Sequence, residues 1–187
     1  MQTIETPFTA TYEVKKSKFI SHLVPIAKFD GLQAKLKAEN PKSNHTVYAL
    51  RYLNEFDQIV ENSSDDGEPK GAAGVPSLNV LRGEELVNVA LLTVRYFGGI
   101  KLGVGGMARA YASAVKEVVG VANLIPYEKE YSFTFETSYA GVQRTEYLLK
   151  KIEIINVKRE FLGNSVAWNI EANAKKLNQF KEEQCTR

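Results

Sequence analysis

The sequence predicts an α+β protein of two domains, with residues 1–127 forming the first domain and residues 128–187 the second. Two observations support this. Segments that alternate or run apolar, as strands do, are interleaved with segments whose apolar residues recur at helical spacing. Between Pro126 and Lys129 the character of the chain changes, and a second set of strands and helices begins. At 187 residues the chain is long enough to bury one large core or two small ones.

The first domain is expected to begin with strands and to end with a long helix. Residues 8–26 alternate well enough for one or two strands, and the following helical spacing stops at Asn40-Pro41. The later elements are a strand at 45–53 with a possible partner at 56–62, a loop at 63–74, a short helix through Leu81, a strand at 86–97 and a helix at 105–120. The strand at 86–97 is almost continuously apolar, which is typical of burial on both faces.

The second domain has the order strand, helix, strand, strand, helix. Residues 131–139 alternate as a strand does, residues 142–152 carry one apolar helical face, and residues 175–184 are helical. Two strands, 154–161 and 165–172, are expected to pair across Gly163-Asn164. This order is one strand short of a ferredoxin-like unit. Either the last strand is truncated or another segment fills its place.

Composition limits the classes of function. The net charge of +2 is too small for a protein that wraps a polyanion, so a nucleic-acid site has to come from local clustering. Cys185 is the only cysteine and the only histidines are His22 and His45, so neither a zinc set nor a histidine-rich metal centre is expected. The chain lacks a membrane-length apolar stretch and a secretory signal, and we expect a cytoplasmic protein without cofactor or metal.

Residues 98–106 contain five of the 13 glycines, directly after the predicted buried strand and at the start of a helix. The match to a dinucleotide fingerprint is loose, and no Walker pattern is present. Residues 86–116 carry four cations and no acid. Two interpretations remain open: a tight strand-to-helix connection, and contact with an anion or nucleic-acid backbone at the helix N-terminus. The predicted binding residues are Arg95, Tyr96, Gly98, Gly99, Lys101, Gly103, Gly105, Gly106 and Arg109.

The acidic loop at 63–74 has two interpretations as well. Asp65, Asp66 and Glu68 offer the oxygen ligands that Mg²⁺ prefers. Alternatively, Asp65 or Asp66 pairs with Arg95 or Arg109 and orders the loop, which is the interpretation we favour.

Three further features have a structural and a functional interpretation. His45 is either a structural histidine or a proton-transfer group. Tyr96 and Phe97 are either core residues or a stacking platform for bases. The basic run of Lys15, Lys16 and Lys18 is either a solvated strand face or part of a phosphate-binding surface.

Four stretches, at 15–20, 45–51, 63–76 and 94–111, occur in the order seen in the YigZ/IMPACT family, which the chain resembles over residues 10–125. The resemblance implies an N-terminal mixed sheet backed by helices, like the second domain of a small-subunit ribosomal protein. It also implies a ferredoxin-like second domain, similar to the last domain of elongation factor G, and this chain departs from that pattern because its last strand is missing. The family motif further includes His45, Asp65, Asp66, Gly67, Glu68, Pro69 and Tyr111.

The resemblance also indicates a setting, because the eukaryotic members of this family regulate translation under stress. We therefore expect a non-enzymatic binding protein that contacts RNA or the ribosome through the basic glycine-rich loop. One alternative is a protein-interaction module whose partner belongs to the translation machinery. Another is an enzyme for a small phosphorylated or nucleotide substrate, with Mg²⁺ on Asp65 or Asp66 and proton transfer by His45. No catalytic residue and no membrane partner is predicted.

Overall fold

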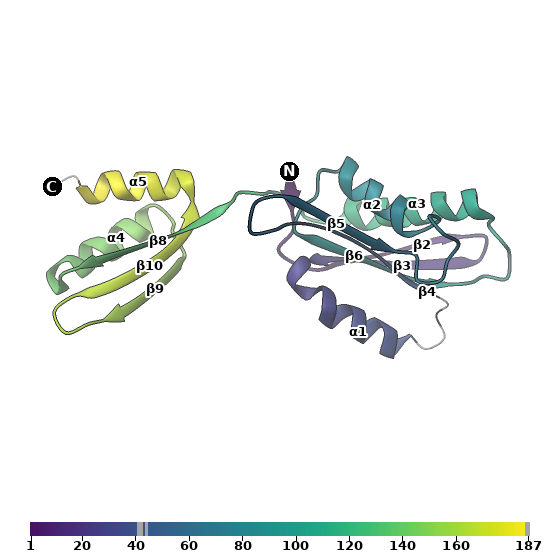
Figure 1. Cartoon of the computed structure of the whole chain (residues 1–187), viewed down its shortest axis with the longest axis horizontal. Coiled ribbons are helices and arrows are strands. Elements are labelled where there is room, and N and C mark those ends of the chain that lie inside the picture. Colours follow the sequence, from purple (N-terminus) through teal and green to yellow (C-terminus); the bar gives the residue numbers. More distant parts are fainter. Residues whose placement is uncertain (41–42, 44, 186–187) are drawn as a thin grey trace. The chain divides into compact units, whose positions relative to one another are not determined.

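A computed structural model describes residues 1–40, 43 and 45–185, and the chain divides into two compact units, 1–127 and 128–187 (Figure 1). The α+β class predicted from the sequence is confirmed. No helix among the described residues is long and apolar enough to cross a membrane. The predicted helix stop at Pro41 lies outside the described residues, and the helix itself ends at Glu39.

The first unit is built on a five-stranded sheet in the order β2-β3-β6-β4-β5. Its strands are β2 (Phe8–Val14), β3 (Ser17–Pro25), β4 (His45–Leu53), β5 (Ile59–Ser64) and β6 (Val89–Tyr96). A two-stranded pair, β1 (Gln2–Thr3) with β7 (Ile125–Pro126), joins the two ends of the unit.

The neighbouring strands of this sheet are all antiparallel, which corrects the expectation of a mixed sheet. The reason is the position of β6. Strands β3 and β4 run parallel to each other but are not neighbours, because β6 lies between them and is antiparallel to both. The connection from β3 to β4 therefore crosses over a strand that comes later in the chain.

Helices cover both faces of the sheet (Figure 1). Helices α2 (Gly74–Gly83) and α3 (Val104–Val121) pack on one face, and η1 (Ile26–Lys28) and α1 (Phe29–Glu39) lie against the other. Strand β6 is consequently buried on both faces along nearly its whole length, as its continuous apolar sequence predicts. Its consecutive residues Leu91 and Leu92 point to opposite faces and belong to the two different cores.

The second unit has a three-stranded antiparallel sheet in the order β8-β10-β9. Its elements are β8 (Glu130–Thr137), η2 (Tyr139–Gly141), α4 (Val142–Lys151), β9 (Asn156–Phe161), β10 (Val166–Asn173) and α5 (Ala174–Cys185). Both helices pack on one face over Trp168 and Ile170 of the central strand. The opposite face carries polar residues, among them Ser132 and Asn169, which are hydrogen bonded to each other.

Candidate functional site

The acidic loop after β5 is folded around the carboxylate of Asp65. This carboxylate accepts hydrogen bonds from the backbone N–H groups of Gly71 at 2.8 Å, Ala73 at 3.0 Å and Gly74 at 2.8 Å. It thereby satisfies donors at the N-terminus of α2, where unpaired N–H groups and the helix dipole favour a negative charge. Burial opposes the ionised form, yet the three hydrogen bonds hold the pKa of Asp65 below its usual range.

Asp66 ties the same loop to the start of β4. Its Oδ2 accepts a hydrogen bond from the backbone N–H of Thr46 at 2.7 Å, and its carbonyl oxygen lies 2.7 Å from Nδ1 of His45. Because a carbonyl oxygen only accepts, Nδ1 of His45 carries a proton and donates it to this bond. The loop backbone thus fixes the orientation of the His45 ring.

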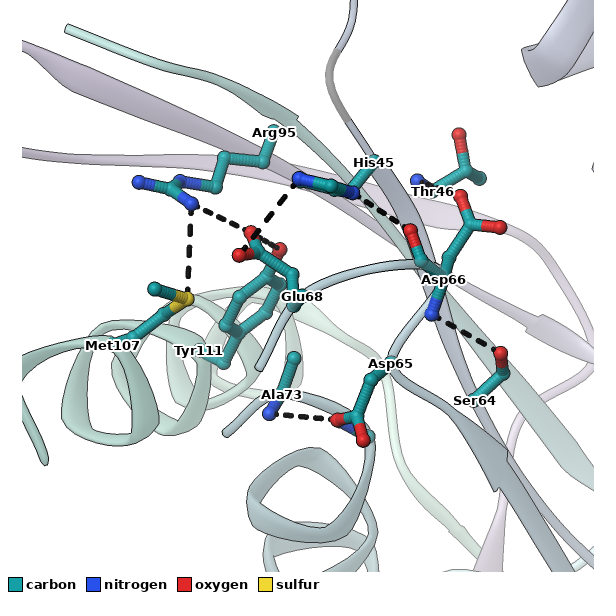
Figure 2. A network of polar contacts seen from close by, with 11 residues as sticks. His45, Thr46, Ser64, Asp65, Asp66, Glu68, Ala73, Arg95, Met107 and Tyr111 are labelled. Carbon is teal, nitrogen blue, oxygen red and sulfur yellow. Dashed lines mark hydrogen bonds and ion pairs between the residues drawn. The ribbon is translucent and has the colours of Figure 1, made fainter. Parts of the chain in front are cut away.

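Glu68 is the centre of a buried polar network (Figure 2). Its Oε1 accepts hydrogen bonds from Nη1 of Arg95 at 2.6 Å and from the hydroxyl of Tyr111 at 2.8 Å. Its Oε2 lies 3.9 Å from Nε2 of His45. Burial, reinforced by the adjacent Glu68 carboxylate, raises the pKa of Tyr111 far above its usual range, so the phenol remains a donor.

Arg95 is part of this interior, with only 5% of its surface exposed. Its guanidinium lies 5.6 Å from the ring centre of Phe19 and 5.7 Å from that of Phe97, and Nη1 also contacts Sδ of Met107 at 3.7 Å. Its Nε has no hydrogen-bond partner in the described part of the chain. The pairing predicted from the sequence involves a different acid, because Glu68 rather than Asp65 or Asp66 reaches Arg95.

The glycine loop, defined as residues 97–103, lies between β6 and α3. Gly98 packs against the tip of the β2–β3 hairpin so closely that a Cβ atom there would lie 2.0 Å from the backbone carbon of Lys16. Its N–H donates to Oγ of Ser17 at 3.1 Å. One of the five glycines therefore serves a close approach between two backbone segments.

A second glycine starts the helix. Gly103 is the N-cap of α3 and has a φ of 73°, a left-handed conformation that suits glycine. In the described chain no side chain caps this terminus and its first turn contains no acid. The side chains of Lys101 and Arg109 on either side are exposed. Free N–H groups and two cations therefore meet at one end of an 18-residue helix.

The hairpin tip beside Gly98 adds two more cations. Lys15 and Lys16 are both exposed and have φ values of 45° and 64°. The left-handed region costs a non-glycine residue about 1–2 kcal/mol. Glycine or asparagine would form such a turn at lower cost. Lys18 does not belong to this group of cations. It directly precedes the buried Phe19 in β3, so its side chain points to the other face of the sheet.

Apolar side chains are exposed on the same loop. Phe97 is 46% exposed, Ile100 45% and Val104, the first residue of α3, 59%. We call the exposed set formed by Lys15, Lys16, the glycine loop, Val104 and Arg109 the glycine-loop surface.

The predicted site residues thus separate into three groups. Lys101, Arg109 and Gly98, Gly99, Gly103, Gly105 and Gly106 lie on or next to the glycine-loop surface. The internal network is formed by His45, Asp66, Glu68, Arg95 and Tyr111, while Asp65 binds backbone N–H groups at the start of α2; Gly67 and Pro69 lie in the same loop. Tyr96 belongs to the opposite face of the sheet, where its hydroxyl donates to Asn40 at 2.6 Å.

Two contributors escaped sequence reasoning, Ser17 and Met107. Ser17 is a small polar residue within a strand and gives no signal of its own. The partner of Arg95 did have a usable signal, because a lone cation in an otherwise apolar strand requires a buried acid, an unpaired buried charge being costly. Among the described residues, no group of three or more histidine, cysteine, aspartate or glutamate side chains could hold a metal ion.

A family model described as the Impact N-terminal domain matches residues 15–119, which include both loops. The chain is 33% identical over 174 residues to the IMPACT family member YvyE of Bacillus subtilis, covering 90% of this chain and 78% of that protein. It is 34% identical over 158 residues to the IMPACT family member YigZ of Escherichia coli, with 80% and 76% covered.

A solved structure, described as the crystal structure of a hypothetical protein, is similar over 98% of this chain and 90% of its own, with a TM-score of 0.71 and 26% identity. The fold and the matched domain define a two-unit protein built around an Impact N-terminal domain. The chain belongs to the IMPACT family, and the resemblance seen in its motifs is confirmed.

Proposed function

We propose that this protein is a non-enzymatic, cytoplasmic binding protein that acts near translation and contacts RNA or ribosomal phosphates through the glycine-loop surface. The setting comes from the family, whose eukaryotic members regulate translation. The mode of contact comes from the chemistry of the surface. The observation that carries the proposal is the uncapped N-terminus of α3 between the exposed side chains of Lys101 and Arg109.

Helix N–H groups donate to phosphate oxygens, and the positive end of the helix dipole favours an anion. The lysines of the hairpin tip extend the positive charge next to Gly98, against which that tip is packed. Arg95 has a different part in this proposal. Its side chain hydrogen bonds to Glu68 of the acidic loop inside the fold and does not touch the phosphate.

The test is RNA binding by fluorescence anisotropy across a salt series, comparing the wild type with Lys101→Ala/Arg109→Ala. Wild-type affinity is expected to fall steeply as salt rises, because counterions released from RNA drive the association. Losing two phosphate contacts on single-stranded RNA lowers the salt slope by about 1.4, at roughly 0.7 for each contact.

The matched control is Lys28→Ala/Lys175→Ala, which removes the same charge from two exposed positions, in η1 and in α5. It leaves the salt slope close to that of the wild type if the glycine-loop surface holds the phosphates. Equal losses in both variants would mean that binding follows net charge alone, and salt-insensitive binding would refute the proposal.

The exposed apolar residues favour a second candidate, a protein partner from the translation machinery. Ile100 and Val104 present apolar surface beside the cations, which a phosphate backbone does not need. If the partner is a protein, the wild-type chain captures it in a pull-down that survives nuclease treatment. The variant Ile100→Ser/Val104→Ser then no longer captures it. Under the RNA proposal the same variant keeps most of its RNA affinity.

A further inference from the structure

Phe97 is an aromatic residue of the glycine loop to which phosphate binding gives no role. It directly follows Tyr96, the last residue of β6, and 46% of its surface is exposed. Its ring lies over the guanidinium of Arg95, with 5.7 Å between the ring centre and Cζ. Because the guanidinium lies on one face of the ring, the exposed part of the ring belongs mainly to the other face and the edge.

The guanidinium beneath this ring is itself fixed. Nη1 of Arg95 donates to Glu68 at 2.6 Å and contacts Sδ of Met107 at 3.7 Å, as Figure 2 shows. On another side, the guanidinium lies 5.6 Å from the ring centre of Phe19. A cation attracts the face of an aromatic ring, so a cation fixed by these contacts holds the Phe97 ring in one place.

The backbone next to Phe97 is held as well. Gly98 packs against the backbone of Lys16, and its N–H donates to Oγ of Ser17 at 3.1 Å. The Phe97 ring is therefore positioned from its backbone and from its inner face in the absence of any ligand. A side chain that is already ordered loses little conformational entropy when a ligand binds to it.

Cations surround the ring without any acid among them. The residues of the glycine-loop surface include four cations, Lys15, Lys16, Lys101 and Arg109, and no aspartate or glutamate. The two lysines belong to the hairpin tip that packs against Gly98, the residue after Phe97. A ligand that complements this surface has a flat apolar group for the ring and several negative charges beside it.

Single-stranded RNA has this combination in every nucleotide, since each phosphate is followed by a base that can turn outward. In a duplex the bases are paired and stacked inside the helix, so an exposed ring on the protein meets only sugars and phosphates. An acidic protein segment supplies the charges but carries a flat group only where it has an aromatic side chain. A fixed ring among four cations therefore favours a single strand.

We propose that Phe97 is a base-stacking residue for single-stranded RNA, with one base on the exposed face of its ring and the adjoining phosphates among the cations of the glycine-loop surface. Arg95 is the positioning residue that holds the ring. The inference rests on the proposed function, because it names the form of RNA that this surface takes. Every base has a flat π face, so the site selects single strands over duplexes and discriminates little among bases.

The experiment measures the affinity of the full chain for an unstructured RNA strand of about ten nucleotides, by fluorescence anisotropy across a salt series. Phe97→Leu keeps apolar carbon over Arg95 but removes the flat ring. It should weaken binding about fivefold or more at every salt concentration, the lower end of the effect of losing an aromatic stacking partner. The salt slope should stay that of the wild type, because no phosphate contact is lost.

Controls on both molecules accompany this variant. Phe97→Tyr keeps the ring and should restore the affinity, while Ile100→Ala removes an apolar side chain that is 45% exposed on the same loop and should leave it unchanged. A strand with the same sugar-phosphate backbone but no bases should bind the wild type only as tightly as it binds Phe97→Leu. A 2-aminopurine base in the strand should lose fluorescence on saturation with the wild type and keep it with Phe97→Leu.

The outcomes separate this inference from the proposed function. Equal affinities of wild type and Phe97→Leu for the strand, with a salt slope that still depends on Lys101 and Arg109, would overturn the stacking role and leave the proposed function standing. Equal binding of the strands with and without bases would do the same. No RNA binding at all would overturn both. A nuclease-resistant capture of a protein that only Phe97→Leu loses, without an effect on RNA, would assign the ring to a protein partner.

Discussion

The acidic loop and the glycine loop are the two motif-rich segments of the first unit, and they use their polar groups in opposite ways. In the acidic loop, Asp65, Asp66 and Glu68 all accept hydrogen bonds from the protein itself. In the glycine loop, the helix terminus is uncapped in the described chain, and Lys101 points to solvent. The difference indicates that the acidic loop builds the fold, whereas the glycine loop is available for a partner.

The comparison is tested most severely at Glu68. Glu68→Ala is expected to lower the free energy of unfolding by about 3–5 kcal/mol, because Arg95 is left as a buried, unpaired cation. Urea unfolding of the full chain, followed by the signal of the first unit, measures the loss. A loss below about 1 kcal/mol would contradict the structural role assigned to the acidic loop.

The double variant Glu68→Met/Arg95→Met sharpens this test. Apolar replacement of both partners of a buried ion pair is often neutral, so the double variant is expected to be more stable than Glu68→Ala. If the loss of stability in the double variant equals the sum of the losses in the two single variants, the two residues act separately. Glu160→Ala, which removes an exposed acid of β9, should change stability by less than about 0.5 kcal/mol.

Gly98→Ala is expected to have the next largest effect. The added carbon meets the backbone of Lys16 and Ser17, so the hairpin tip must shift, at a cost of about 1–3 kcal/mol. Gly120→Ala is the matched control, since that helical position is open and alanine raises helix stability by roughly 0.5–1 kcal/mol. The two glycine substitutions should therefore shift thermal unfolding in opposite directions.

Asp65→Ala should cost about 0.5–2 kcal/mol at pH 7, the range measured when a side chain that accepts hydrogen bonds from a helix N-terminus is replaced by alanine. Because its folded pKa is lowered, the Asp65 carboxylate adds stability above its unfolded pKa of about 4, and this contribution is lost as the pH falls through the folded value. The stability difference between wild type and variant should therefore shrink below about pH 4. A difference that does not change down to pH 2 would contradict this assignment.

Lys101→Ala/Arg109→Ala is expected to have the smallest effect on stability. Both side chains are exposed, so the free energy of unfolding should change by less than about 0.5 kcal/mol. Chemical denaturation of the same samples used for RNA binding provides the measurement. A large loss of stability would assign these residues to the fold and would weaken the contrast between the two loops.

Local sequence patterns predict most helices and strands of this protein, since apolar periodicity reports directly on burial. The strand at 86–97 and the helix at 105–120 correspond to β6 and α3. The insertion of β6 between β3 and β4 has no local signal, because it depends on pairing between segments far apart in the chain. The antiparallel arrangement of the sheet was unpredictable for that reason.

The sequence predicts which residue types make up the site, but it does not predict which of their side chains point into the interior. Arg95 requires a buried acid, and three acids lie within residues 65–68. Which of them turns inward depends on the left-handed conformations of Asp66, with a φ of 44°, and Gly67, with a φ of 87°. The sequence hypothesis also grouped Arg95 with Tyr96, although neighbouring strand residues face opposite sides of a sheet.

The pairing of β1 with β7 has a consequence for synthesis of the chain on the ribosome. Gln2 pairs with Pro126 and Thr3 with Ile125, and the backbone of Gln2 also hydrogen bonds to Glu85 and Val87, so both partner segments of β1 come much later in the chain. The β2–β3 and β4–β5 hairpins can form earlier, because their pairing is local. Strand β1 is thus fixed later than these two hairpins, because both of its partner segments follow them in the chain.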